Sequence, residues 1–276
     1  MAVFAHITDL HLRPPGILAL GRIDTDAYAV RAVGAINARH AAVDAVLVTG
    51  DITDLGEEEA YNRAEMLLSR LPAPVIVVPG NHDRTAALID AFSAFPGFAA
   101  LPVPGKACHA HTLGGVDVVA LDTSVDDVAG HAHHGTLGES QLEWLDATLA
   151  RTGPTLIAMH HPPFEAGIPF MDEIGLRDAR AFAKVLARHE NVVRIVCGHV
   201  HRGIVAEVGG VPTMAIPGVA HQVALAVDEI TPPGLVMEPP AYALHMVEGA
   251  RAVSHIAYVD TYGIPVGFDE HDRVPA

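Results

Sequence analysis

Carboxylate, amide and imidazole side chains occur in five short clusters along the first 201 residues of the chain. Each cluster directly follows a short apolar run rich in β-branched residues, which is typical of a buried strand. Side chains of these kinds are ligands that Mn, Fe, Co or Zn accept, whereas copper(I) prefers sulfur. The clusters are Asp9-Leu-His11, Gly50-Asp51, Gly80-Asn81-His82-Asp83, His160-His161 and Gly198-His199-Val-His201.

Seven side chains in these clusters could coordinate metal, which is too many for one tetrahedral ion. With one bridging carboxylate they suit two ions about 3.5–4 Å apart, the spacing used for in-line displacement at phosphorus. Asp9 and His11 are two residues apart, so in an extended chain both side chains would leave on one face. The adjoining glycines, Gly50, Gly80 and Gly198, are expected to allow tight turns that aim the ligands. The predicted metal ligands are Asp9, His11, Asp51, Asn81, His160, His199 and His201.

The elements that must position these clusters alternate between strand and helix patterns, which predicts βαβ units. In open α/β sheets the loops at the carboxyl ends of the strands form the ligand crevice, so five such loops can converge. The expected strands are Val3–Ile7, Ala45–Val48, Val75–Val78, Val116–Leu121, Thr155–Met159 and Val192–Cys197. The expected helices are Ala27–Arg39, Glu57–Ser69, one from Arg84, Ser140–Arg151 and Asp178–Arg188.

The last third of the chain has a different pattern. From residue 202 onward there are strands and turns but no strong helix, which predicts antiparallel β structure. Val205–Val208 and Val211–Ala215 are separated by two glycines and are predicted to form a β-hairpin. The Pro-rich stretch over 231–240 is predicted to be a long loop.

As a set and in this order, the five clusters resemble the signature of calcineurin-like metallophosphoesterases. The His160-His161-Pro-Pro run and the segment Pro217-Gly-Val-Ala-His221-Gln222 most resemble the bacterial class III cyclic-nucleotide phosphodiesterase and glycerophosphodiesterase branch. The resemblance implies an α/β fold of two facing β-sheets flanked by helices, a four-layer α/β/β/α sandwich. It further implies a catalytic domain over residues 1–221 and a β-rich C-terminal extension over 222–276, which could be a cap or an oligomerisation element.

The resemblance also implies how the ligands divide between the two divalent metal ions, which would be Fe, Mn, Zn or Co. Asp51 would bridge them. The first ion would be held by Asp9, His11 and His201, and the second by Asn81, His160 and His199.

Further roles follow from the resemblance. His82 would be a catalytic residue that stabilises the transition state or protonates the leaving alkoxide. Asp83 would orient His82 or another group of the site. The substrate would contact Asn81, His82, His161 and His221. For His161 a hydrogen bond to another site residue is an alternative, and His221 could instead be an ordinary loop residue.

These features predict a metal-dependent phosphodiesterase, in which a hydroxide bridging the metals attacks phosphorus. Neither a G-x-S-x-G elbow nor a Walker sequence is present, since Gly105-Lys106 is followed by Ala107. The expected substrates are small diesters, either 3′,5′-cyclic nucleotides or glycerophosphodiesters. A phosphomonoesterase of the same fold is one alternative. A metal-free protein-binding scaffold is another, but it would be expected to have lost ligands.

Composition limits the partners and the location of the protein. The 276 residues carry a formal charge of −16, which disfavours a long nucleic acid as a partner. Bound cations would offset this charge for an anionic substrate. Two distant cysteines exclude a Cys-built zinc site and a disulfide framework. Without a signal-peptide pattern or an apolar run of about 20 residues, the chain is expected to be cytoplasmic and not in a membrane. The family resemblance suggests a homo-oligomer, a dimer or higher.

One histidine cluster lies outside the signature. His131-Ala-His133-His134 is similar to the start of a metallo-β-lactamase motif, which normally continues to Asp-His, but here Gly135 follows. A solvated loop is the favoured interpretation, although this loop could line the mouth of the pocket.

Overall fold

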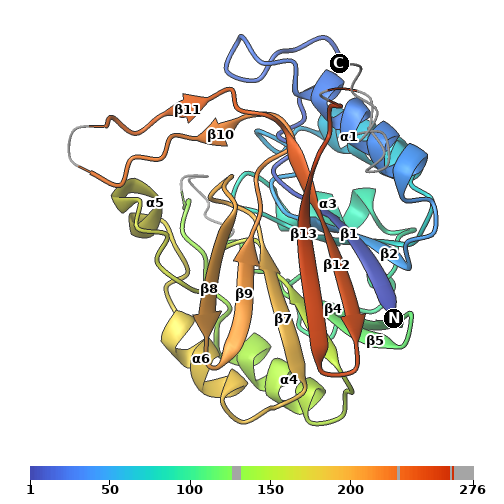
Figure 1. The fold of residues 1–276 in the computed structure, drawn as a ribbon, viewed down its shortest axis with the longest axis vertical. Helices are drawn as coiled ribbons and strands as arrows, with labels where there is room; N and C mark the ends of the chain where they lie inside the picture. Colours follow the sequence, from blue (N-terminus) through green and yellow to red (C-terminus); the bar gives the residue numbers. More distant parts are fainter. Residues whose placement is uncertain (126–131, 229–230, 262, 264–276) are drawn as a thin grey trace, which may run out of the picture.

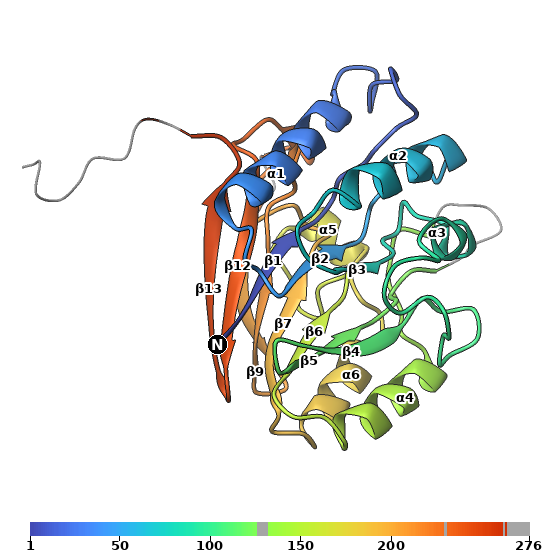
Figure 2. The ribbon, with the colours of Figure 1, turned by 90° about the vertical axis from the view of Figure 1, so that its right-hand side faces the viewer.

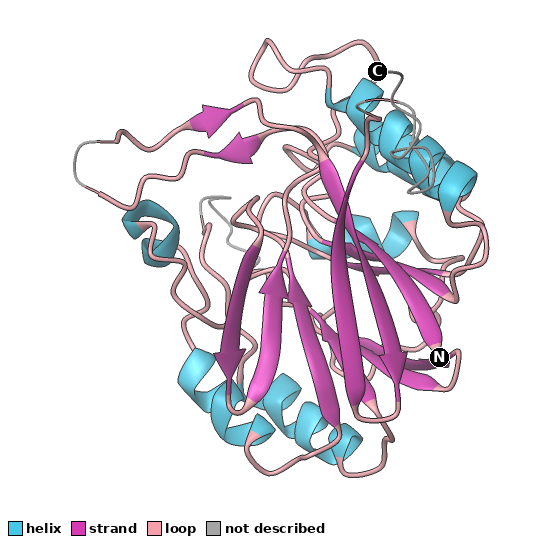
Figure 3. Cartoon of the chain, in the orientation of Figure 1, coloured by secondary structure: helices cyan, strands magenta, loops and turns pink. Residues whose placement is uncertain are grey.

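Two β-sheets pack face to face in the computed structural model, which describes residues 1–125, 132–228, 231–261 and 263. Helices cover the outer face of each sheet, so the molecule has the predicted four layers (Figures 1 and 2). Figure 3 shows that loops gather beyond the upper ends of the strands of both sheets.

The first sheet has the strand order β13-β12-β1-β2-β3. Strands β1, β2 and β3 are parallel, β12 pairs antiparallel with β1, and β13 pairs antiparallel with β12. Its strands are β1 (Ala2–Ile7), β2 (Ala45–Thr49), β3 (Val75–Val78), β12 (Ala241–Glu248) and β13 (Arg251–Tyr258). Its outer face is covered by α1 (Thr25–Arg39), α2 (Glu58–Leu68) and α3 (Thr85–Ala91).

The second sheet has the order β4-β5-β6-β7-β9-β8, and β5, β6, β7 and β9 run parallel. Its strands are β4 (His109–Leu113), β5 (Val116–Ala120), β6 (Thr155–Ala158), β7 (Val192–Cys197), β8 (Ile204–Val208) and β9 (Val211–Ala215). Its outer face is covered by α4 (Glu139–Leu149) and α6 (Ala179–Leu186). The remaining elements are α5 (Pro169–Glu173) and the ribbon of β10 (Gln222–Val223) and β11 (Leu235–Val236).

Apolar side chains from both sheets fill the space between them. Phe4 and Leu47 from the first sheet and Leu156 and Val196 from the second are all fully buried in one cluster. Strands covered on both faces are expected to be continuous apolar runs, which explains why β2 and β3 show no alternation. This packing brings the carboxyl ends of the parallel strands of the two sheets close together.

Every predicted strand and helix is present, with ends shifted by at most about two residues, as expected for frayed termini. The predicted hairpin is confirmed as β8 and β9. The sequence did not reveal β4 or α5, and it did not show that β12 pairs with β1, placing His245 opposite Phe4. The described chain has no helix that is both long and apolar enough to cross a membrane.

Residues 222–276 were predicted to form a β-rich extension, and their described part is built of strands. Strands β12 and β13 belong to the first sheet, whereas the β10–β11 ribbon projects from the body (Figure 1). The predicted boundary after residue 221 falls just before β10. The division into a catalytic domain and an extension stays a prediction.

Candidate metal centre

The loops that follow the parallel strands are bonded to one another through their backbones. Asp9 N donates to Gly50 O at 3.1 Å, and Gly198 N donates to His160 O at 3.1 Å. A hydrogen bond of 2.7 Å from His160 Nδ1 to Thr49 O joins the second sheet to the first. All seven predicted ligands are therefore brought together, and six of them are buried while Asn81 is half-buried.

The ligands converge through left-handed backbone. Five of the six non-glycine residues with positive φ in the described chain are predicted ligands: Asp9 (55°), His11 (46°), Asp51 (47°), His199 (70°) and His201 (47°). The expectation that an extended backbone would place Asp9 and His11 on one face was wrong, because both residues have positive φ. Such conformations cost about 1–3 kcal/mol each and are held by the surrounding structure, which is typical of a functional site.

The three glycines beside the ligands serve mainly to leave room. Gly50 has φ +89°, as the predicted tight turn requires, and a Cβ there would also overlap the His160 ring. Gly80 and Gly198 do not have positive φ, so turn geometry does not explain them. A Cβ on Gly80 would overlap the Asp51 carboxylate, and a Cβ on Gly198 would overlap the Thr8 hydroxyl. These positions need glycine because the ligand loops pack directly against them.

The first ligand cluster comprises Asp9, His11, Asp51 and His201, whose ligand atoms all lie within 4.8 Å of one another. His11 Nε2 is 3.2 Å from His201 Nε2 and 3.6 Å from Asp51 Oδ2. His201 Nε2 is 3.2 Å from Asp9 Oδ1. The other Asp9 oxygen, Oδ2, is buried and has no hydrogen-bond partner in the described chain.

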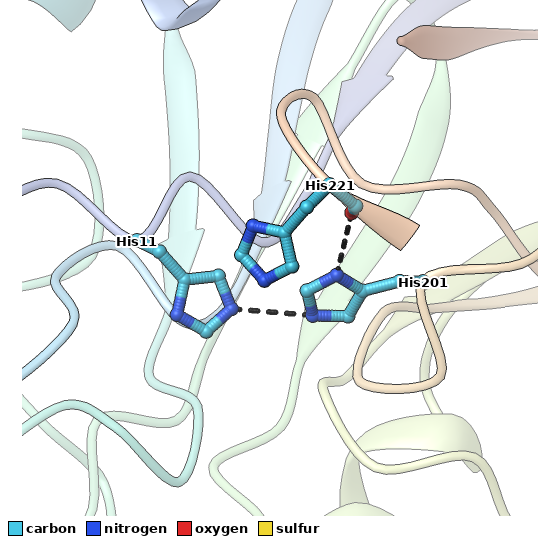
Figure 4. A group of neighbouring side chains, drawn as sticks. All are labelled: His11, His201 and His221. Atoms are coloured by element: carbon cyan, nitrogen blue, oxygen red, sulfur yellow. Dashed lines mark hydrogen bonds between the residues drawn. The ribbon is translucent and has the colours of Figure 1, made fainter. Parts of the chain in front are cut away.

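The hydrogen bonds behind this cluster set the histidine tautomers. His11 Nδ1 lies 3.3 Å from Asp54 Oδ1. His201 Nδ1 lies 2.9 Å from the main-chain O of His221 (Figure 4). Since both partners are acceptors, each Nδ1 donates and each neutral ring presents its Nε2 lone pair to the other. Two lone pairs facing each other beside carboxylates repel unless a cation lies between them. Hydrogen bonds of this kind are typical of metal-binding histidines.

The second cluster is built in the same way. Asn81 Oδ1 is 3.1 Å from His160 Nε2 and 2.9 Å from His199 Nδ1. His160 Nε2 also lies 3.4 Å from Asp51 Oδ1, while its Nδ1 donates to Thr49 O. In its neutral form, with the proton on Nδ1, the His160 ring directs the Nε2 lone pair at two oxygens. His199 Nε2 is buried and has no partner in the described chain.

Asp51 lies between the two clusters, with Oδ2 toward His11 and Oδ1 toward His160. Burial alone would lower the pKa of His160, but the Asp51 and Asp9 carboxylates outweigh it and raise this pKa to about 9. The buried carboxylates thus favour positive charge beside them. Orphaned acceptors, fixed tautomers and a carboxylate facing both clusters together fit a pair of divalent cations.

His82 and Asp83 are both beside the metal ligands but have different contacts. The main-chain N of His82 donates to Asp51 Oδ1 at 2.9 Å, and its ring Nδ1 donates to the main-chain O of Asp54 at 2.8 Å. The His82 side chain is 30% exposed, so solvent or substrate can reach it. The His82 ring is thus held by the main-chain O of Asp54, and the orientation of His82 by Asp83 stays a prediction.

Asp83 joins two ligand loops. Its carboxylate accepts hydrogen bonds from Ile52 N at 3.0 Å, Gly80 N at 2.9 Å and the Tyr61 hydroxyl at 3.2 Å. Burial and the nearby Asp51 carboxylate raise the pKa of Asp83 to about 6. These contacts support the other predicted role of Asp83, the orientation of a neighbouring group of the site.

His161 is fully buried against the second cluster. Its Nδ1 is 2.7 Å from the Thr123 hydroxyl, and its Nε2 donates to the main-chain O of His133 at 3.1 Å. Burial and the neighbouring His160 lower the pKa of His161 to about 3, so the ring is neutral. This geometry supports the hydrogen-bonding alternative more than the predicted contact with substrate.

His221 lies against the first cluster (Figure 4). Its ring centroid is 5.0 Å from that of His11 and 4.8 Å from that of His201. Burial and His11 lower the pKa of His221 to about 3, and its buried Nδ1 has no partner in the described chain. The Gln222 side chain holds this loop by bonding both N and O of Gly218. His221 is thus a neighbour of the first cluster, and its contact with substrate stays a prediction.

Sequence reasoning missed two residues of the site. Asp54 contacts His11 and His82, and its position three residues after Asp51 in one loop was the available signal. His133 was predicted to lie in a solvated loop or, as the alternative, at the mouth of the pocket, and its Nδ1 is 3.2 Å from Asn81 Nδ2. His131 lies outside the described residues.

A four-layer sandwich with Asp, Asn and His side chains gathered at one edge of two sheets defines a metal-dependent phosphoesterase. The chain belongs to the calcineurin-like phosphoesterase family, whose model matches residues 2–203. It is therefore an enzyme of the hydrolase class, as predicted.

Several relatives of known name are similar over most of the chain. The glycerophosphodiester phosphodiesterase GpdQ of Enterobacter lignolyticus is 32% identical, covering 99% of this chain and 97% of the relative. A probable cyclic nucleotide phosphodiesterase of Rhodopseudomonas palustris is 36% identical, covering 91% and 90%. Among solved structures, a dimetal phosphatase from Danio rerio superposes with a TM-score of 0.66 at 18% identity, covering 94% and 96%, and this likeness concerns the fold.

Proposed function

We propose that this enzyme hydrolyses small phosphodiesters, either 3′,5′-cyclic nucleotides or glycerophosphodiesters, with two divalent metal ions. The observation that carries the proposal is the pair of ligand clusters sharing the Asp51 carboxylate, with His82 beside them. Relatives named for both diester classes support the choice of a diester. The ions would be Fe, Mn, Zn or Co, since this set of oxygen and nitrogen donors accepts each of them.

Asp51 is proposed to bridge the two ions. The first ion would also be held by Asp9, His11 and His201, and the second by Asn81, His160 and His199. When bound, the ions would supply a water-derived nucleophile near neutral pH and neutralise the phosphoryl oxygens.

The remaining side chains orient the ligands and move a proton. The Asp54 carboxylate and the main-chain O of His221 hold His11 and His201 with Nε2 directed into the first cluster. His82 Nδ1–H is used by the main-chain O of Asp54, so Nε2 is the atom that can deliver a proton to the leaving alkoxide. Asn81, His82 and His221 are proposed to contact the phosphoryl group, and His161 to act through its hydrogen bonds.

Hydrolysis of a substrate panel tests the proposal. Purified protein with added Mn²⁺ would be assayed with bis(p-nitrophenyl) phosphate, p-nitrophenyl phosphate, 3′,5′-cyclic AMP, 2′,3′-cyclic AMP and glycerophosphoethanolamine. We expect diester turnover far above monoester turnover, and the best natural diester identifies the substrate class. A preference for monoesters would indicate the phosphomonoesterase alternative. Inactivity with every divalent metal would support the scaffold alternative.

We also propose a homo-oligomer that forms through the β10–β11 ribbon. Large apolar side chains, including Leu225, Leu235 and Met237, are exposed on or beside this ribbon, and a two-stranded ribbon is marginally stable alone. Leu235→Glu should lower the mass measured by light scattering, whereas Val205→Glu, at an exposed site on β8, should not. A monomeric wild type would refute this assembly.

Both cysteines are free and buried, which supports the proposed cytoplasmic location.

A further inference from the structure

His133 lies in the segment between β5 and α4, the loop that the sequence assigned to solvent. Its Nδ1 is 3.2 Å from Asn81 Nδ2, and its ring centroid is 5.7 Å from that of His82. We propose that His133 is a positioning residue that holds the Asn81 amide with its oxygen directed into the second metal cluster. This inference rests on the proposed two-metal site, and it adds a residue that the family signature does not include.

The argument depends on the two different ends of the Asn81 amide. Its Oδ1 faces His160 Nε2 at 3.1 Å and His199 Nδ1 at 2.9 Å, so it is the end that a cation could bind. Half a turn about the last side-chain bond would place the NH₂ group there instead, and an NH₂ group donates hydrogen bonds and cannot bind a cation. A lone pair on His133 Nδ1 accepts from the NH₂ group only. His133 thereby selects the orientation of Asn81 that can bind metal.

Buried residues hold His133 in place. Its main-chain O accepts from His161 Nε2 at 3.1 Å, and His161 Nδ1 is in turn 2.7 Å from the Thr123 hydroxyl. A Cβ on Gly135 would overlap the His161 ring, so the loop packs directly on that histidine. His161 is fully buried and adjoins the ligand His160. The second cluster is therefore supported by a chain of contacts from His161 through His133 to Asn81.

The exposure of the His133 side chain makes the inference testable. Exposed side chains away from caps and special backbone conformations usually change stability by less than about 0.5 kcal/mol when replaced. A variant at this position is thus expected to fold, and its effect on Asn81 can be measured separately from stability. His133→Asn keeps an acceptor oxygen near the place of Nδ1, whereas the polar atoms of His133→Gln reach the place of Nε2. The two variants distinguish the ends of the ring.

The experiment measures Mn²⁺ binding to metal-stripped full-length protein by equilibrium dialysis, with no substrate present. In His133→Ala we expect one of the two Mn²⁺ binding events to weaken about 10-fold, as for other residues that orient metal ligands, with the other event unchanged. His133→Asn should restore it and His133→Gln should not. His255→Ala, at an exposed histidine on β13, is the matched control. With diester substrates, His133→Ala should recover most of its kcat at saturating Mn²⁺.

Other results would overturn the assignment. His133→Ala that binds two Mn²⁺ as tightly as the wild type would show that Asn81 does not need this contact. Restoration by Gln and not by Asn would place the function at Nε2. A wild type that binds two Mn²⁺ but hydrolyses no diester would refute the proposed activity and leave the role of His133 to be decided by dialysis. A wild type that binds fewer than two Mn²⁺ would refute both.

Discussion

Replacing Asp54 by Asn should weaken metal binding at the first cluster without altering the main chain. Asp54 Oδ1 accepts a hydrogen bond from His11 Nδ1 at 3.3 Å, and Asp54 Oδ2 lies 3.5 Å from Arg13 Nη1. Both neighbours are donors, so the NH₂ group of an asparagine would face a donor in either orientation. If it faces His11, the proton on Nδ1 must move to Nε2, and the lone pair that points into the cluster is lost.

The size of the effect follows from the geometry. The Asp54 side chain is only 11% exposed, so its interaction with His11 is little screened by solvent. A hydrogen bond to a charged group contributes about 1.5–3 kcal/mol, which corresponds to about 10- to 100-fold in affinity. The same range is found when hydrogen-bond partners of metal-binding histidines are removed. We therefore expect Asp54→Asn to weaken Mn²⁺ binding at the first cluster, which contains His11, by about 10- to 100-fold.

The assay is Mn²⁺ titration of metal-stripped protein by calorimetry, with Glu57→Gln as the control. Glu57 Oε1 lies 2.7 Å from Arg13 Nη2, so Glu57 belongs to the same group of charged side chains. Its hydrogen bonds go to Arg13 and not to the metal ligand His11. Glu57→Gln removes the same formal charge as Asp54→Asn and should bind Mn²⁺ almost as the wild type does. Equal weakening in both variants would mean that net charge, not the His11 tautomer, sets the affinity. Unchanged binding in Asp54→Asn would refute the reasoning.

Three other variants test the site and the fold. Asp51→Ala should lose both metals and activity, because its two oxygens face both clusters, and metal analysis that finds two tightly bound ions would exclude bridging. His82→Ala should keep both metals and lose rate, most for diesters with poor leaving groups; an equal loss for activated and unactivated esters would show that His82 is not the general acid. His245→Gln should make unfolding less sensitive to acid, because burial and Arg194 lower the pKa of His245 to about 3. Since the unfolded chain binds this proton and the folded chain does not, stability falls by about 1.4 kcal/mol per unit as pH drops from about 6.5 toward 3. Urea unfolding that shows the same pH dependence in variant and wild type would contradict this account.

The site was predictable where its chemistry is local. The side chains of these clusters are carboxylates, amides and imidazoles, which bind metals, and each cluster follows an apolar run, so the clusters after β1, β2, β3, β6 and β7 can be recognised one by one. Their order along the chain carried the family resemblance. The same reasoning could not place β12, because an apolar strand carries no mark of the neighbour it will pair with.

Hydrogen-bond partners and backbone conformation could not be predicted from the sequence either, because they too depend on residues far apart in the chain. Asp54 is an unremarked acidic residue until the fold sets its carboxylate beside His11. By sequence His133 is one residue of a polar loop. In the fold its carbonyl is bound by His161 and its ring lies beside Asn81. The left-handed turns at Asp9 and elsewhere are conformations that these residues do not favour by themselves.

The amino-acid sequence by itself thus determined which side chains are available for metal and on which strand ends they lie. Only the tertiary structure decided that the strand ends of two sheets packed face to face meet there, how each imidazole is turned and which neighbours hold it. Those properties come from contacts between residues far apart in the chain, such as Thr49 with His160 and Asp9 with His201. Because burial of the apolar faces between the sheets sets those contacts, they exist only in the folded chain.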